Sequence, residues 1–198
     1  MPRGLFIVLE GVDGAGSTTQ TRLLTDFLIQ QGLPAIATKE PTEGRIGQVI
    51  RTYLKSKVLH PSIDALLFAA DRMEHLETVV KPALERGEHV ISDRYIESTL
   101  AYQSADGVET GWIEIVNRFA IKPDQVIILD INPATSLSRK HATARERFET
   151  IEFLNRVRQN FKKRAASQGY VIVDAERTIM QVHEALKQII LPRLGAGK

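Results

Sequence analysis

The sequence contains no cysteine and no long hydrophobic run, and each absence excludes a class of protein. Without cysteine there is neither a disulfide framework nor a zinc or iron–sulfur site held by thiolates. This fits a reducing cytoplasm, the location we expect. No stretch approaches the ~20 apolar residues of a membrane span, and the apolar run near the N-terminus is too short for a secretory signal. We therefore expect no membrane partner.

The sequence also lacks a marked excess of charge of either sign. Its 26 basic and 24 acidic residues leave a net charge of +2, which gives no reason to expect nucleic acid as a partner. The basic residues nevertheless cluster in one short run that holds Arg139, Lys140, Arg145 and Arg147. Taken alone, such a run is commonly a solvated helix face.

Length and composition predict a single globular domain over residues 1–198. A chain of this size should bury about 70 % of its unfolded surface, so it needs no metal or disulfide to fold. Five short apolar runs rich in β-branched residues predict strands buried on both faces. They are residues 5–9, 35–38, 89–92, 126–129 and 170–173.

Segments of helical periodicity lie between these runs and after the last one. They are residues 18–31, 63–86, 148–167 and 179–191. Strands that alternate with helices are typical of a doubly wound α/β fold, here with a five-stranded parallel sheet. The helix over 63–86 has apolar residues on more than one side. This pattern fits either a central core helix or a helix that also forms a dimer interface.

A glycine-rich segment joins the first predicted strand to the first predicted helix. It reads Glu10-Gly11-Val12-Asp13-Gly14-Ala15-Gly16-Ser17-Thr18-Thr19. Its spacing matches the phosphate-binding loop G-x-x-x-x-G-K-[ST] except at the lysine, which is replaced by Ser17. Glycines let successive backbone N–H groups turn toward a phosphate, and the following helix adds the positive end of its dipole. Because the lysine is missing, the loop alone is also compatible with a purely structural turn.

Five motifs follow one another between residue 5 and about residue 158. They are the loop at 11–16, Lys39-Glu40-Pro41-Thr42 with Ile50-Arg51, Leu67-Phe68-Ala69-Ala70-Asp71-Arg72, the segment 92–103 with Asp93-Arg94-Tyr95, and Leu129-Asp130-Ile131-Asn132-Pro133 followed by Arg139. In order and spacing the chain resembles the thymidylate kinase family of P-loop nucleoside monophosphate kinases. The resemblance implies phosphorylation of thymidine monophosphate by ATP with Mg²⁺, and a homodimer.

The resemblance assigns four residues to the thymine base. Phe68 would stack on the ring, and Arg72 would donate to a carbonyl. Thr99 and Gln103 would read the remaining polar edge, because stacking alone does not select a base. The residues also allow plainer interpretations, in which Phe68 is a core residue and Arg72 forms a surface pair with Asp71.

The resemblance assigns other residues to the sugar and phosphate of the acceptor. Asp13 would accept from the 3′-hydroxyl, and Tyr102 would crowd the 2′ position. Arg51 and Arg94 would clamp the acceptor phosphate, a task suited to the guanidinium fork. Glu40 belongs to the same substrate site.

Acidic residues follow several predicted strands, where α/β proteins bind their ligands. Asp93 is the preferred residue for organising Mg²⁺ through water, with Thr18 as a direct ligand. Asp130 also follows a strand and competes for this role, and Asp93 could be an ordinary residue at a strand end.

The basic run falls where the family carries a lid, at about residues 139–149. The loop holds no arginine, so Arg145 or Arg147 would reach the transferring phosphoryl group. Arg139 would stack on the adenine of ATP. With Asp13, Asp93 and Arg94, the two lid arginines complete the predicted catalytic set.

The serine at position 17 leaves three interpretations open. The chain could be a natural variant that uses another cation, an inactivated variant, or a nucleotide-binding protein without turnover. The first is preferred because the other motifs are intact, and the substitute cation could be Lys140, Arg145, Arg147 or Arg22. The acceptor could also be another monophosphate such as deoxyuridylate, which lacks only the 5-methyl group.

Overall fold

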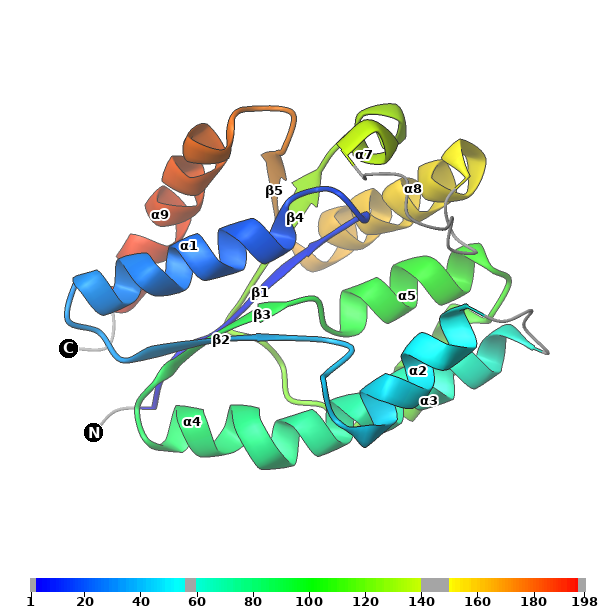
Figure 1. Ribbon diagram of the computed structural model, residues 1–198, viewed down its shortest axis with the longest axis horizontal. Coiled ribbons are helices and arrows are strands. Elements are labelled where there is room, and N and C mark those ends of the chain that lie inside the picture. Colours follow the sequence, from blue (N-terminus) through cyan, green and yellow to red (C-terminus); the bar gives the residue numbers. More distant parts are fainter. Residues whose placement is uncertain (1–2, 56–59, 140–149, 196–198) are drawn as a thin grey trace.

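A five-stranded, all-parallel sheet forms the centre of the protein, and a computed structural model describes residues 3–55, 60–139 and 150–195 (Figure 1). The strands are β1 (Phe6–Gly11), β2 (Ala35–Lys39), β3 (His89–Asp93), β4 (Gln125–Asp130) and β5 (Val171–Asp174). Their order across the sheet is β2-β3-β1-β4-β5. The predicted fold class is confirmed, and each strand lies within two residues of its predicted ends.

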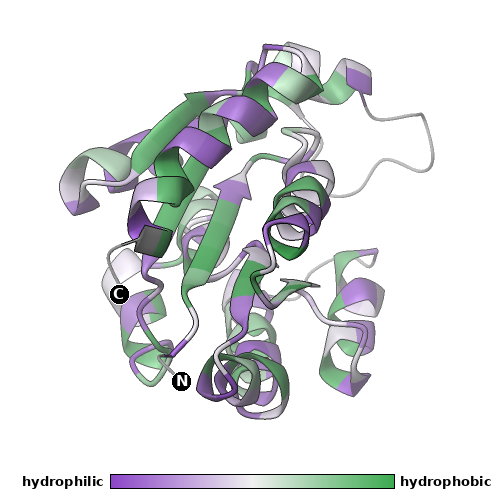
Figure 2. Ribbon diagram, turned by 90° about the vertical axis from the view of Figure 1, so that its left-hand side faces the viewer, coloured by the Kyte–Doolittle hydropathy of each residue, from purple (hydrophilic) through white to green (hydrophobic). Residues whose placement is uncertain are grey.

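The central strand β1 shows why apolar runs predicted the sheet. It pairs with β3 on one side and β4 on the other, and its residues Phe6 to Leu9 are wholly buried. Helices cover both faces, so neither side of the strand can be polar. Figure 2 shows the strands as mainly hydrophobic, surrounded by helices of mixed character. At the edge, β5 leaves Val171 and Ile172 exposed.

Helices pack on both faces of the sheet. They are α1 (Ser17–Gln30), α2 (Arg45–Leu54), α3 (Pro61–His75), α4 (Lys81–Glu85), α5 (Ile96–Ala105), α6 (Thr110–Val116), α7 (Pro133–Arg139), α8 (Ile151–Gln168) and α9 (Ile179–Gly195). In Figure 1, α1 and α9 lie side by side on one face, while α4, α5 and α8 cover the other.

The long helix predicted over 63–86 is not regular. A π-helical turn, η1 (Leu76–Val80), separates α3 from α4. Pro82 lies in the first turn of α4, and proline has no N–H to donate to a carbonyl one turn earlier. A wider turn of this kind accommodates a local break in the hydrogen-bond ladder. As predicted, the segment ends at a glycine, Gly87, which has a φ of 82°.

Four short helices escaped prediction, namely α2, α5, α6 and α7. Each has ten residues or fewer, and so short a segment shows too few repeats for helical periodicity to be recognised. The helix predicted over 148–167 begins at Ile151 in the described chain. The Thr150 side chain caps it by accepting from the N–H of Phe153 at 3.1 Å.

The predicted lid at 139–149 lies outside the described residues except for Arg139. None of the described helices is long and apolar enough to span a membrane.

The packing of α1 on the sheet makes a matched pair of substitutions informative. Leu24→Ala removes a wholly buried side chain and should lower the free energy of unfolding by about 2–5 kcal/mol. Ile29→Ala, on the same helix but 54 % exposed, should change it by less than about 1 kcal/mol. Chemical denaturation of both variants measures the difference, and equal losses would contradict the burial of this helix face.

Candidate active site

The glycine-rich loop connects β1 to α1 in the manner that its sequence predicted. Gly14 and Gly16 have φ values of 79° and 92°, a left-handed conformation that costs little only for glycine. Gly14 also approaches α7 so closely that a Cβ atom there would lie 2.7 Å from the carbonyl oxygen of Ser136. The Ser136 hydroxyl donates to the carbonyl of Asp13 at 2.5 Å, which ties the loop to α7.

Two cavities open beside this loop. The larger, of about 770 Å³, is lined by the loop, by the ends of β3 and α7, and by the segment that follows β5. The smaller, of about 230 Å³, lies between the loop, α2, α3 and α5. Asp13 and Arg94 line both cavities, so the two meet at these side chains.

The smaller cavity gathers every residue predicted for the acceptor nucleotide. Its lining includes Asp13, Glu40, Arg51, Phe68, Arg72, Arg94, Thr99, Tyr102 and Gln103. These residues come from five separate segments of the chain, which only the fold brings together.

The larger cavity gathers most residues predicted for ATP. Its lining includes Asp13, Gly14, Ala15, Gly16, Ser17, Thr18, Thr19, Asp93 and Arg139. Gly11 and Val12 do not line it; Val12 is buried. Lys140, Arg145 and Arg147 lie outside the described residues.

Arg94 occupies the boundary between the cavities. Its Nη2 donates to Asp13 Oδ1 at 2.6 Å and its Nη1 donates to the Gly11 carbonyl at 3.0 Å. Burial alone would lower the pKa of this guanidinium, but the carboxylates around it, including Asp13 and Asp93, raise it well above its ordinary value. Arg94 therefore remains a cation where the cavities meet.

Tyr102 supports the same boundary. Its hydroxyl accepts from the backbone N–H of Asp13 at 3.0 Å, and the Arg94 guanidinium lies 5.4 Å from the centre of its ring. Burial raises the pKa of the Tyr102 phenol, which keeps the group neutral.

The Arg72 guanidinium is fixed deep in the smaller cavity, at 1 % exposure. Nε donates to Glu40 at 2.9 Å, Nη1 to Asn117 Oδ1 at 2.5 Å, and Nη2 to Thr99 at 3.0 Å. Asp71 turns instead to Thr42, accepting from its N–H and its hydroxyl. The alternative interpretation of an Arg72–Asp71 surface pair is therefore wrong.

Arg51 and Phe68 also line the smaller cavity. Arg51 donates through Nη1 and Nη2 to the Thr42 carbonyl, at 2.7 and 2.6 Å, and forms an ion pair with Glu43. Phe68 is half-buried and lines the cavity, so it is not simply a core residue.

A sequence model of the thymidylate kinase family matches residues 9–186. The chain is 40 % identical over 188 residues to a probable thymidylate kinase of Pyrobaculum aerophilum, an alignment covering 93 % of this chain and 95 % of the relative. It is 41 % identical over 197 residues to one of Pyrococcus abyssi, with 95 % and 96 % covered. It is 39 % identical over 207 residues to one of Thermococcus gammatolerans, with 98 % and 99 % covered. The chain belongs to the thymidylate kinase family. It is thus an enzyme, a phosphotransferase.

The thymidylate kinase site contains one buried carboxylate oxygen that has no partner among the described residues. Asp93 Oδ2 accepts from the Thr18 hydroxyl at 2.5 Å, whereas Oδ1 is buried and unpaired. The described chain offers no group of three or more His, Cys, Asp or Glu side chains that could hold a metal ion by themselves. A hydroxyl and a carboxylate at the loop suit Mg²⁺, which takes few protein ligands and completes its shell with phosphate oxygens and water.

The competing carboxylate, Asp130, has protein partners. Arg158 donates to both of its oxygens at 2.6 and 2.8 Å, and Lys162 lies 3.0 Å from Oδ2. Burial acts to raise the pKa of Asp130, but these two cations outweigh it and lower the pKa below its ordinary value. The geometry therefore favours Asp93 over Asp130 for the metal.

Three polar residues that support the thymidylate kinase site from outside its two cavities escaped prediction. His75 lies beside Glu40, with Nδ1 3.1 Å from Oε1, and three residues after Arg72 on the same helix. That spacing places His75 and Arg72 on one helix face and could have revealed it. Glu10 could have been noticed as a charge at the end of an apolar strand. Asn117 follows α6 and carries no sequence signal.

The buried charges predict a contrast between two glutamates. Glu40→Ala leaves the Arg72 guanidinium buried without its carboxylate and should lower the free energy of unfolding by about 3–5 kcal/mol. Glu43→Ala removes an exposed partner of Arg51 and should leave the unfolding midpoint almost unchanged. Denaturant unfolding of both variants measures this, and a mild effect at position 40 would mean that the pair is not buried.

Proposed function

We propose that the enzyme transfers the γ-phosphoryl group of ATP to thymidine monophosphate, with the donor in the larger cavity and the acceptor in the smaller. The observation that carries this arrangement is the meeting of the two cavities at Asp13 and Arg94. Phosphoryl transfer requires donor and acceptor phosphates in line and a positive environment for the moving group. A cation held at the junction meets both needs.

Selection of the thymine base is supported by unused hydrogen-bonding groups. Thymine presents an N–H donor flanked by two carbonyl acceptors. Gln103 Oε1 is buried without a partner among the described residues, and it can accept from that N–H. Arg72 Nη1 has a second N–H besides the one donated to Asn117, and it can donate to a carbonyl. Phe68 provides the face on which the ring stacks.

Residues of the same cavity would also bind the sugar and the phosphate of the acceptor. In this proposal Asp13 accepts from the 3′-hydroxyl and Tyr102 occupies the space near the 2′ position. Arg51 and Arg94 exchange part of their present hydrogen bonds, to Thr42 and Gly11, for the acceptor phosphate. Arginine suits this exchange because its planar fork binds two phosphate oxygens at once.

The donor is held by the loop. The backbone N–H groups of residues 14 and 16–19, at the start of α1, would bind the phosphates of ATP. Thr18 and Asp93 would hold Mg²⁺, which when bound neutralises charge on the β- and γ-phosphates. Arg139 lines the same cavity and would contact the adenine.

The missing loop lysine has candidate substitutes in the described chain. Arg94, Arg139 and Arg177 line the larger cavity, whereas Arg22 is exposed on α1 and is not part of the lining. We propose that these arginines, together with the basic residues of segment 140–149, supply the charge that the lysine normally brings. The serine at position 17 is then a natural variation.

Assembly and location complete the proposal. A homodimer through α3 and η1 is supported by exposed apolar side chains on this segment, Leu66 at 49 % and Val79 at 37 % exposure. Sedimentation equilibrium measures the oligomeric state directly. We propose a cytoplasmic location, because a chain without cysteine fits a reducing compartment.

The acceptor specificity is tested by a panel of monophosphates. With ATP and Mg²⁺, we expect kcat/KM for thymidine monophosphate to exceed that for deoxyuridine monophosphate by roughly 10–200-fold, the usual value of one methyl group in an apolar pocket. ADP release measured in a coupled assay gives both constants. A preference for AMP or CMP would contradict the acceptor assignment, and binding without any diphosphate product would contradict the activity.

The loop substitution is tested by restoring the lysine. Ser17→Lys should change kcat by less than about tenfold, because arginines already supply positive charge to the cavity. Steady-state kinetics at saturating thymidine monophosphate measures the effect, with Ser17→Met as a control of similar size without charge. If the lysine raises kcat tenfold or more and the methionine does not, the natural loop lacks a charge that nothing else replaces.

A further inference from the structure

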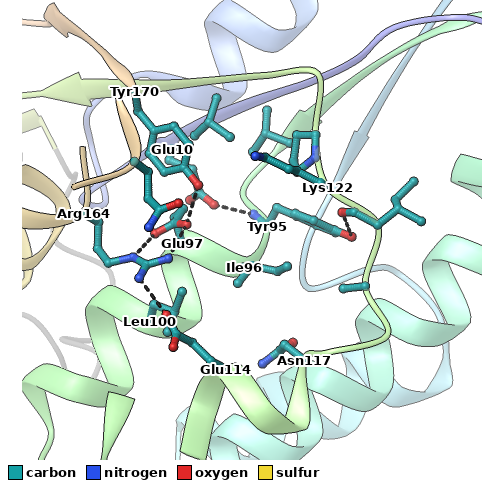
Figure 3. A pocket seen from close by; sticks show the side chains of 16 residues that line it. Glu10, Tyr95, Ile96, Glu97, Leu100, Glu114, Asn117, Lys122, Arg164 and Tyr170 are labelled. Atoms are coloured by element: carbon teal, nitrogen blue, oxygen red, sulfur yellow. Dashed lines mark hydrogen bonds and ion pairs between the residues drawn. The ribbon is translucent and has the colours of Figure 1, made fainter. Parts of the chain in front are cut away.

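Glu10 is a carboxylate at the end of the central strand, and neither cavity of the nucleotide site includes it. It is wholly buried and lines a third cavity, of about 280 Å³ (Figure 3). Burial raises its pKa to about 7. A carboxylate in the middle of a parallel sheet is costly unless it is hydrogen-bonded, so its partners show what it supports.

The Glu10 carboxylate accepts three hydrogen bonds from the segment that follows β3. Oε1 accepts from the backbone N–H of Tyr95 at 2.9 Å, drawn in Figure 3, and from the N–H of Ser98 at 3.2 Å. Oε2 accepts from the Ser98 hydroxyl at 2.5 Å. The carboxylate therefore holds the backbone and one side chain at the start of α5.

The Ser98 hydroxyl connects this carboxylate to Arg94. Because its proton points to Glu10, its lone pairs are free to accept, and Arg94 Nη1 donates to it at 2.9 Å. A serine whose proton pointed toward Arg94 would place two donors face to face. The direction of the Ser98 hydroxyl, and with it the position of the guanidinium, depends on the acceptor at residue 10.

The backbone at Arg94 has a second dependence on Glu10. Arg94 has a φ of 74°, the one positive value among the described non-glycine residues. Such a conformation persists only where neighbouring contacts hold it. The Arg94 N–H donates to Leu9, its carbonyl accepts from Ser92, and the next N–H, that of Tyr95, donates to Glu10.

We propose that Glu10 is a positioning residue for phosphoryl transfer, which acts through Ser98 and the Tyr95 backbone to hold Arg94 at the junction of the two nucleotide cavities. The proposal rests on the function proposed above, in which Arg94 binds the acceptor phosphate. It adds a residue that touches neither nucleotide.

A second carboxylate in the same cavity provides the matched control. Glu97 is also buried, and it receives hydrogen bonds from Arg164 at 2.8 and 3.0 Å and from the Tyr170 hydroxyl at 3.0 Å. Within the described residues, the Arg94 side chain bonds to Gly11, Ser98 and Asp13, and to neither Arg164 nor Tyr170. Glu97→Gln therefore perturbs the cavity and its stability but removes none of the hydrogen bonds that connect Glu10 to Arg94.

The test compares Glu10→Gln, Ser98→Ala, Arg94→Ala and Glu97→Gln in the full-length enzyme at pH 8. Glutamine keeps an oxygen for the two backbone N–H groups but presents an NH₂ to Ser98, which reverses the hydroxyl. We expect Glu10→Gln and Ser98→Ala each to lower kcat/KM for thymidine monophosphate about tenfold, the loss of one charge-assisted hydrogen bond. Glu97→Gln should leave this constant within twofold of the unmodified enzyme, although its unfolding midpoint falls.

The double variant Glu10→Gln/Arg94→Ala separates positioning from a general structural role. If Glu10 acts through Arg94, the double variant is no slower than Arg94→Ala alone. Additive losses, or a loss in Glu97→Gln equal to that in Glu10→Gln, would overturn the proposal. Normal kcat/KM in Arg94→Ala would instead overturn the role of Arg94 in the proposed function. Loss in Arg94→Ala with none in Glu10→Gln and Ser98→Ala would overturn the positioning role alone.

Discussion

The ion pair between Asp13 and Arg94 is the interaction on which the rest of the site depends. It joins the loop after β1 to the residue after β3, two neighbouring strands whose carboxyl ends meet at one edge of the sheet. Parallel pairing fixes these ends side by side, and a 2.6 Å contact between the two side chains lies where the two cavities beside the loop meet. Charge at this junction is partly buried, so it acts more strongly than on an open surface.

A second constraint is the burial of two charged side chains beside the smaller cavity. Arg72 and Glu40 form a pair with almost no exposure, and His75, Asn117 and Thr99 form further hydrogen bonds or close polar contacts with it. Such a pair adds little net stability, because desolvation offsets much of the attraction. It does fix a guanidinium in one orientation, which is what recognition of a flat base edge requires. The surrounding residues matter because each removes an alternative position of the Arg72 side chain.

Much of the fold and site could be read from the sequence, for reasons visible in particular residues. Buried parallel strands are apolar on both faces, so runs such as 5–9 identified the sheet. The acceptor residues occur in motifs such as Leu67-Phe68-Ala69-Ala70-Asp71-Arg72, and the predicted acceptor residues line a single cavity. Pairing between distant residues was not accessible, because nothing in the sequence relates Asn117 to Arg72 or Ser98 to Glu10. The π-helical turn η1 was also missed, because the apolar periodicity of residues 63–86 is continuous and the effect of Pro82 on the helix was not considered.

The close approach of Gly14 to Ser136 makes the residues that are tolerated at these two distant positions depend on each other. Any side chain at position 14 would meet the carbonyl oxygen of residue 136, and the hydroxyl of Ser136 already holds the Asp13 carbonyl. The glycine-rich loop and the helix that carries Arg139 to the same cavity are therefore packed directly against each other. Natural selection acting on the loop acts also on α7, more than a hundred residues further along the chain. We expect amino-acid substitutions in this enzyme to accumulate on the outer faces of its helices rather than where the loop contacts α7.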